Sequence, residues 1–470
     1  MLFNSIDFLI FFPVVTILYF LTPQKFRWFL LLTASCIFYM FFIPVYILIL
    51  IFTIIIDYIA GIMIERTEHH KKLFLIISII ANVSVLAVFK YFNFLAININ
   101  SLADKDIIPL LKIILPIGLS FHTFQAMSYT IEVYRGNQKA EKHFGIYALY
   151  VMFYPQLVAG PIERPQNILH QFRIKHSFSA ELLYSGLRLM LWGLFKKVVV
   201  ADRLSICVDA IYSDPSHYTN YLNILIAFVF FSVQIYCDFS GYSDIAIGSA
   251  RVMGFDLMVN FNRPYFSKNI KEFWSRWHIS LSTWFRDYLY IPLGGNRVKV
   301  SRLYLNIAIV FLLSGLWHGA NWTFVVWGAL HAFFIIINIA SGDYFFKQPT
   351  FINKLCSWFI TFSAVTIAWV FFRAANFSDA FLLLQNLFTL NHSTPFVAVV
   401  NLGQISFVIS SLLISVFVIG FTFFVEKNSD TLLLSFTNKK AVDIAFCSTV
   451  LILIILLGVF QRNSFIYFQF

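Results

Sequence analysis

The sequence predicts an all-α integral membrane protein, a polytopic bundle of about 11–13 transmembrane helices with interfacial and re-entrant helices. Hydrophobic residues make up 59% of the 470 residues and charged residues only 12%, with a mean hydropathy of +0.78. A soluble domain would carry about twice that charged fraction. The apolar residues come in long runs, without the two-residue alternation of a membrane barrel. Because backbone in lipid must be hydrogen-bonded within its own segment, these runs predict helices.

A helix needs about 20 mostly apolar residues to cross the hydrocarbon core, which is about 30 Å thick. The runs that meet this test are 7–22, 27–42, 44–64, 73–96, 145–160, 182–200, 221–248, 303–316, 322–340, 355–373, 404–425 and 440–460. Shorter or adjacent runs at 108–133 and 378–390 are candidates for a further span or a re-entrant piece. No internal repeat or low-complexity linker divides the chain, so residues 1–470 are expected to form one domain in contact with membrane lipid.

The N-terminus, the cysteines and the net charge each narrow the class of protein. The opening MLFNSIDFLIFFPVV has no Lys or Arg before its apolar run and no small-residue cleavage site after it, which predicts a first membrane helix and not a signal peptide. Five singly scattered cysteines exclude a disulfide framework and a cysteine zinc site. The net charge of +11 is expected of loops that follow the positive-inside rule. No nucleic-acid partner is expected, because no basic stripe or recognition fold accompanies the charge.

The organisation changes at 251–302, where long apolar runs give way to aromatic and basic sequence. Between Arg251 and Val300 eight Lys or Arg stand against three acidic residues, and this excess predicts the cytoplasmic face. Trp and Tyr at this density suit the membrane–water interface, so the segment is expected to form an amphipathic helix pair there. The sequence PLGGN at 292–296 predicts a tight turn. This interpretation accounts for the aromatic and basic residues but does not explain why a histidine, His278, stands among them.

The segment 303–340 places an ionisable residue in an apolar context. His318 follows Trp317, and Gly319 and Asn321 come next. Ionisable groups at membrane depth are costly, which makes His318 the leading candidate for a functional residue. Histidine titrates near neutrality, so it can take a proton from a hydroxyl and return one to a leaving thiolate. This chemistry indicates acyl transfer from a thioester, and the small residues beside it predict close approach of a helix or a ligand.

Other histidines and a metal site receive simpler interpretations. His122 and His331 are expected to be packing residues in the bundle. No metal is expected, because a zinc site would need further ligands at set spacings and no H-E-x-x-H motif is present.

Long motifs along the whole chain point to a known family. They are RPYFSKNIKEFWSRWHISLSTWFRDYLYIPLGGN, LSGLWHGANWTFVVWGALHA, YPQLVAGPIERP, YCDFSGYSDIAIG, AWVFFRAANFSDA and the opening MLFNSIDFLIFFPVV. With these, the sequence resembles the membrane-bound O-acyltransferases (MBOAT), and more narrowly their alginate O-acetyltransferase (AlgI-type) branch.

The resemblance implies a helical bundle pierced by a tunnel, with two histidines near its narrowest point. The histidine of the WHG motif falls on His318, as general base toward the acceptor hydroxyl. The histidine of the RWHISLS motif falls on His278, which would position or polarise the donor. The co-substrate would be acetyl-CoA or the phosphopantetheine thioester of an acyl carrier, with no tightly bound cofactor. Gly319 is expected to leave space for the pantetheine arm.

The resemblance also implies a setting, the inner membrane of a bacterium. The donor would reach the enzyme from the cytoplasm, and a periplasmic or membrane-anchored acetyltransferase partner would complete transfer to a polysaccharide hydroxyl. Alginate, cellulose, another exopolysaccharide, peptidoglycan and teichoic acid all remain open as acceptors. The alternatives are D-alanyl-type transfer from a charged carrier protein, a transporter or flippase, and a structural scaffold.

Four charged residues complete the set of candidate supporting residues. Asp287 beside Arg286 is expected to form a local salt bridge and not to act as a catalytic acid. Asp238 and Asp244 lie in an apolar helix, where they are expected to satisfy other buried polar groups or to line the tunnel.

Overall fold

The computed structural model describes residues 1–342, 350–392, 405–430, 440–460 and 465, and every regular element in that part of the chain is helical. The chain divides into two compact units. Met1–Met190 and Ser243–Val259 form the first, and Leu191–Tyr242 and Asn260–Phe470 form the second. The sequence predicts no such division, because no linker-like segment marks it.

Six helices within the described ranges are long and apolar enough to cross a membrane, so the chain is a multi-pass membrane protein as predicted. They are Pro44–Arg66 (α3 with the turn before it), Lys71–Ala103 (α4 through α5), Tyr221–Val252 (α12), Val300–His318 (α15), Trp322–Ala340 (α16) and Phe351–Arg373 (α17). Other predicted spans and candidate runs coincide with further helices, among them α1 (Ile6–Leu21), α2 (Gln24–Met40), α10 (Ala180–Phe195), α18 (Phe377–Phe388), α19 (Ile405–Asn428) and α20 (Lys440–Leu457).

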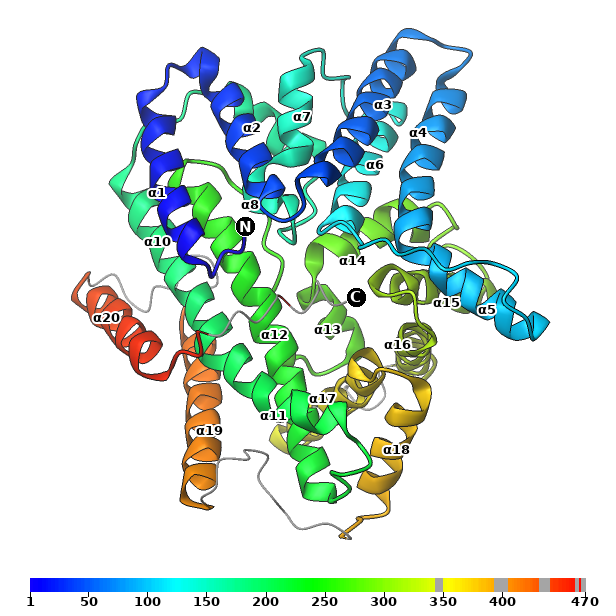
Figure 1. Ribbon diagram of the computed structural model, residues 1–470, viewed down its shortest axis with the longest axis vertical. Helices are drawn as coiled ribbons and strands as arrows, with labels where there is room; N and C mark the ends of the chain where they lie inside the picture. The colour runs from blue at the N-terminus through cyan, green and yellow to red at the C-terminus, as the bar shows by residue number, and fades with distance from the viewer. Residues whose placement is uncertain (343–349, 393–404, 431–439, 461–464, 466–470) are drawn as a thin grey trace. The chain divides into compact units, whose positions relative to one another are not determined.

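The first unit contains the helices α1, α2, α3 and α4, together with α6 (Leu119–Tyr134) and α7 (Phe144–Met152) (Figure 1). The candidate run at 108–133 is helical from Leu119 onward, as α6. One predicted span in this unit was wrong in detail. The span predicted at 145–160 breaks after Met152, since Pro155 has no N–H to donate to the Val151 carbonyl. A helix as short as α7 is about 14 Å long, less than half the hydrocarbon core.

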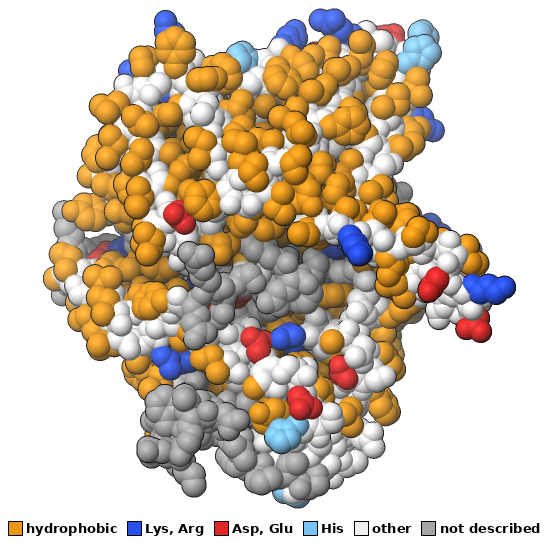
Figure 2. Space-filling view, in the orientation of Figure 1, with side chains coloured by type: hydrophobic (Ala, Val, Ile, Leu, Met, Phe, Trp, Pro, Cys, Tyr) orange, Lys and Arg blue, Asp and Glu red, His pale blue; other side chains and the backbone are white. Residues whose placement is uncertain are grey.

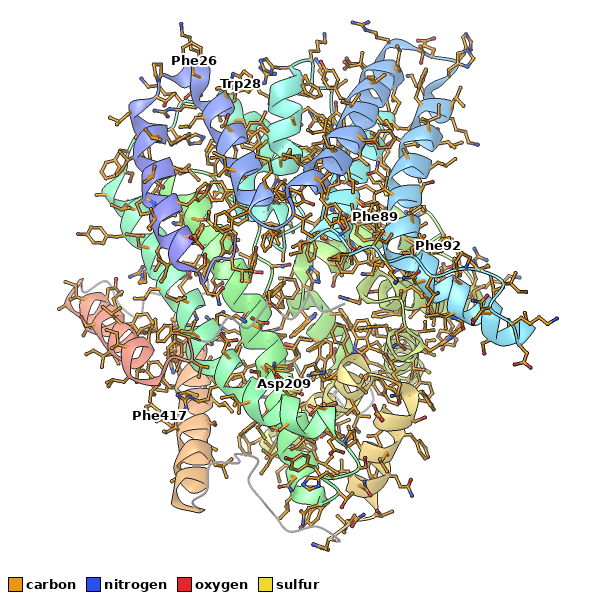
Figure 3. The ribbon with its side chains drawn as sticks, in the orientation of Figure 1. Phe26, Trp28, Phe89, Phe92, Asp209 and Phe417 are labelled. Carbon is orange, nitrogen blue, oxygen red and sulfur yellow. The ribbon has the colours of Figure 1, made fainter. Side chains whose placement is uncertain are left out.

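The surface of the first unit suits a bilayer. Figure 2 shows hydrophobic side chains spread over α1 to α4, with Lys and Arg gathered at one end. Exposed apolar residues include Leu9 and Ile80. Figure 3 labels Phe26 and Trp28 at the end of α2 that adjoins α1, and the Trp28 ring lies 4.6 Å from the ring of His143. Aromatic and basic residues together mark a membrane–water interface.

In the second unit, α15 and α16 form a tightly packed hairpin. A Cβ built on Gly315 would lie within 3.1 Å of the carbonyl group of Phe324, and one on Gly328 within 3.0 Å of that of Phe311. Glycine at these positions therefore lets the two backbones touch. The close helix approach predicted from the small residues is confirmed.

The predicted helix pair within 251–302 consists of α13 (Ile270–Arg276) and α14 (Ile279–Phe285), followed by a π-helical turn at Arg286–Tyr290. The predicted turn at 292–296 is present, with positive φ at Gly294 and Gly295. The pair is more buried than an interfacial segment needs to be, because its aromatic residues pack inside the second unit.

Candidate functional site

Two histidines that are forty residues apart in the sequence lie side by side in the second unit. His278 precedes α14, and His318 is the last residue of α15. Their ring centroids are 6.4 Å apart, and their exposed fractions are 0% and 4%. The sequence predicted both as catalytic residues, and the fold brings them together, while their roles stay predictions.

Aromatic rings surround the two imidazoles. The Trp317 ring is 4.9 Å from His318 and 6.1 Å from His278, and Phe239 lies 4.6 Å from His278. Trp327 and Phe372 pack edge-on against His318 at 5.0 and 5.3 Å. This burial lowers the pKa of His278 to about 3, so its imidazole is neutral at physiological pH. A neutral imidazole offers one N–H donor and one nitrogen acceptor.

A cavity of about 780 Å³ lies between α13, α14, α15 and α16. Its lining includes Ile279, which follows His278 in the chain, and Ser314, one helical turn before His318. Lys271 and Arg286 contribute the positive charges of the lining. Apolar walls with a few cations suit an extended amphiphile that carries an anionic group.

His331 belongs to the same aromatic cluster as His318. The indole Nε1–H of Trp274, which lines the cavity, donates to His331 Nδ1 at 3.3 Å. Since indole nitrogen can only donate, Nε2 of the neutral His331 ring carries the proton. The Trp327 ring lies 4.8 Å from His331 and 5.0 Å from His318. His331 is a packing residue, as predicted, and its i, i+4 spacing from Trp327 was the sequence signal for its place in the cluster.

Two residues predicted to support the site serve the fold. A Cβ on Gly319 would lie within 2.8 Å of three carbons of the Phe324 ring. The expectation that Gly319 leaves space for a pantetheine arm is therefore wrong, because a side chain of the protein fills that space. Asn321 is the N-cap of α16: its Oδ1 accepts from Thr323 N at 3.1 Å, and its Nδ2 donates to the Ala375 carbonyl at 3.1 Å.

The predicted charged residues lie in different places. Arg286 and Asp287 form the expected local ion pair at 2.8 Å, with Arg286 58% exposed. Asp238 is buried and accepts from Lys197, whose Nζ lies 2.8 Å from Asp238 Oδ1. Asp244 lies further along α12, in the first unit, and is half-buried.

The sequence analysis missed a buried group of charges in the second unit, around Lys197. Lys197 Nζ also lies 2.9 Å from Asp202 Oδ1, and the neighbouring Lys196 Nζ lies 2.9 Å from Ser240 Oγ. Lys196, Lys197, Asp202 and Ser240 are all buried. The signal was two adjacent lysines in the apolar run 182–200, which need partners at membrane depth. Within the described ranges, no group of three His, Cys, Asp or Glu is placed to hold a metal ion.

Comparison with known proteins identifies the family. The model of the membrane-bound O-acyltransferase (MBOAT) family matches residues 16–377. The chain is 39% identical over 399 residues to the probable alginate O-acetylase AlgI of Pseudomonas aeruginosa, and this match covers 83% of this chain and 75% of that protein. It is 38% identical over 389 residues to the peptidoglycan O-acetyltransferase of Helicobacter pylori, and this match covers 77% of this chain and 73% of that protein. The teichoic acid D-alanyltransferase of Bacillus subtilis is 30% identical over 228 residues, or 46% of this chain and 57% of that protein. This chain therefore belongs to the membrane-bound O-acyltransferase family, as its sequence motifs indicated.

Proposed function

We propose that this chain moves an acetyl group from a cytoplasmic thioester across a bacterial inner membrane, toward hydroxyl groups of a polysaccharide outside it. The observation that carries the proposal is the pair of buried imidazoles, His278 and His318, whose ring centroids are 6.4 Å apart. The alginate O-acetylases and the peptidoglycan O-acetyltransferase among the relatives support an acetyl group and a polysaccharide acceptor.

His318 acts as the general base. It accepts the proton of the acceptor hydroxyl while that oxygen attacks the acyl carbonyl carbon. The carbon–sulfur bond then breaks, and the thiolate takes the proton from His318. A thioester and an alcohol become an ester and a thiol, with no net gain or loss of protons.

His278 polarises the donor. Its imidazole is neutral because burial lowers its pKa to about 3, and the N–H of a neutral imidazole can donate to a thioester carbonyl oxygen. Such a donor stabilises the negative charge that develops on this oxygen during attack. A fixed N–H in a dry site is more effective than water, because it does not reorient during the reaction.

The cavity beside the histidines holds the donor. Lys271 and Arg286 attract the phosphates of CoA or of a phosphopantetheine arm, and the apolar walls from α15 and α16 accept the arm itself. A periplasmic or membrane-anchored acetyltransferase partner completes transfer to the polymer. The similarity to the teichoic acid D-alanyltransferase makes an aminoacyl carrier protein the second donor to test.

The test is a transfer assay in proteoliposomes with acetyl-CoA and acetylatable oligosaccharides, with release of free CoA thiol as the readout. His318→Ala should lower the rate by roughly 100- to 10,000-fold, as expected for loss of a general base. His170→Ala is the matched control. His170 is an exposed residue of the first unit, and its Nδ1 lies 3.1 Å from the main-chain carbonyl oxygen of Gln166.

Near wild-type thiol release by His318→Ala would contradict the assignment of the base. Movement of oligosaccharide across the bilayer with the thioester left intact would instead support a transporter. If a D-alanyl carrier protein is consumed and acetyl-CoA is not, the donor in the proposal is wrong and the family chemistry stands.

A further inference from the structure

The start of α14 is capped in an unusual way. The first N–H groups of a helix need partners outside the helix, and the side chain of the residue before it commonly supplies one. His143 does so at the start of α7, where its Nδ1 accepts from Ile146 N at 3.2 Å. His278 occupies the same position before α14, yet its side chain makes no capping hydrogen bond.

Asn260, eighteen residues upstream, supplies the missing partners. Its main-chain carbonyl accepts from Ile279 N at 2.9 Å. Its side-chain Oδ1 accepts from Ser280 N at 3.2 Å and from the Ser280 hydroxyl at 2.9 Å. Asn260 is fully buried, so these bonds lie away from water. The first two N–H groups of α14 are thereby satisfied without the imidazole.

The same contact holds an unfavourable backbone conformation. His278 has φ of 42° and ψ of 55°, in the left-handed region that residues with a Cβ rarely adopt. The chain before it is tied to the same upstream segment, because Asn262 N donates to the Arg276 carbonyl at 2.9 Å. Hydrogen bonds to 260–262 therefore anchor both sides of the corner at His278. Strained residues persist where their surroundings fix them in this way.

We infer that Asn260 is a positioning residue for His278. It caps α14 in place of the histidine and holds the corner that directs the imidazole toward His318. If Asn260 were absent, the imidazole would be free to cap α14 itself, as His143 caps α7, and would turn away from the reacting carbonyl. This inference rests on the proposed role of His278 in acyl transfer.

The test compares Asn260→Ala with Asn260→Asp, which keeps an acceptor oxygen in the same place. Asn260→Ala should lower kcat by roughly 10- to 100-fold, the range for a misplaced catalytic group. Asn260→Asp should recover most of that loss. Asn269→Ala is the matched control: Asn269 caps α13 by accepting from Glu272 N at 2.8 Å, so it removes a cap of the same chemistry from the neighbouring helix. Its kcat should stay within about twofold of wild type.

A double-mutant cycle separates positioning from general support of the fold. Glycine adopts a positive φ without strain, so His278→Gly removes the imidazole and leaves the corner intact. Adding Asn260→Ala to His278→Gly should cost no further activity per folded molecule. A further loss equal to that in the wild-type background would overturn the inference, as would an Asn260→Ala enzyme with wild-type kcat. If His278→Gly itself retained full activity, the proposed role of His278 would fail first, and the two failures are thus distinguishable.

Discussion

Replacing Gly319 with alanine distinguishes a packing role from a ligand passage. The added Cβ would meet the ring of Phe324, with three ring carbons within 2.8 Å. Carbon atoms in favourable contact are about 3.5–4.0 Å apart, so even the farthest of the three carbons must move by at least about 0.7 Å, and the nearer two by more. Phe324 is itself buried and packs edge-on against Phe372 at 4.9 Å, which blocks an easy retreat of the ring.

The expected cost follows from this overlap. Overpacking of a well-packed core by one methyl group typically costs about 1–3 kcal/mol. Because the ring is buried and the clash involves several atoms, we expect about 2–3 kcal/mol for Gly319→Ala. The matched control is Gly420→Ala in α19, where an added Cβ meets no atom within 4 Å. That change should be neutral or stabilise by up to about 1 kcal/mol, since alanine favours a helix over glycine.

The assay is thermal unfolding of the purified protein in detergent, run beside acyl transfer. Gly319→Ala should lower the unfolding temperature, and Phe324→Leu in the same chain should restore most of it by removing the ring edge. The packing interpretation is refuted if Gly319→Ala unfolds at the wild-type temperature and has nevertheless lost acyl transfer. That pair of results would return Gly319 to the role of a ligand passage.

Two further predictions concern buried charge. Lys197→Met should destabilise the fold by about 3–5 kcal/mol, because it leaves the carboxylates of Asp202 and Asp238 buried without their cation. Thermal unfolding measures this loss, and adding Asp238→Asn should recover part of it. An unchanged unfolding temperature for Lys197→Met would contradict the prediction. Burial raises the pKa of Glu163 from 4.5 to about 7, so the folded chain holds a proton that the unfolded chain releases. The stability that this proton contributes is present below about pH 4.5 and is lost as the pH rises through 7. Glu163→Gln should therefore flatten the decline of the unfolding temperature with pH over that range. If the variant showed the same decline as the wild type, another group would be responsible for it.

The helices and their membrane setting were predictable because long apolar runs have few alternatives in lipid. The same reasoning failed at 145–160, where composition satisfied the length test but Pro155 interrupts the hydrogen bonding. The burial of α13 and α14 within the second unit was also not predicted. Their aromatic and basic residues fit an interface equally well in sequence, and only packing partners from distant segments decide that they are buried.

The two central histidines were found by membrane depth and by family motifs, but their supporting residues were not. Asn321 and Gly319 were chosen because they stand next to His318, and both are used for helix capping and packing instead. Asn260 stands eighteen residues before the residue it supports, in a segment with no motif of its own. Its importance follows from a tertiary contact that opposes the usual backbone preference of His278, which no local pattern encodes.

The two imidazoles, for which we propose opposite roles, lie at opposite kinds of helix end. His318 is the last residue of α15, at the end where free carbonyl groups give a partial negative charge. His278 stands before α14, at the end where N–H groups give a partial positive charge, which favours the neutral ring. Burial acts in the same direction on His278, since it lowers the pKa to about 3. A neutral imidazole of this kind can donate a hydrogen bond to a substrate oxygen. The proposed roles of base for His318 and carbonyl polariser for His278 thus assign the two imidazoles to opposite ends of two helices.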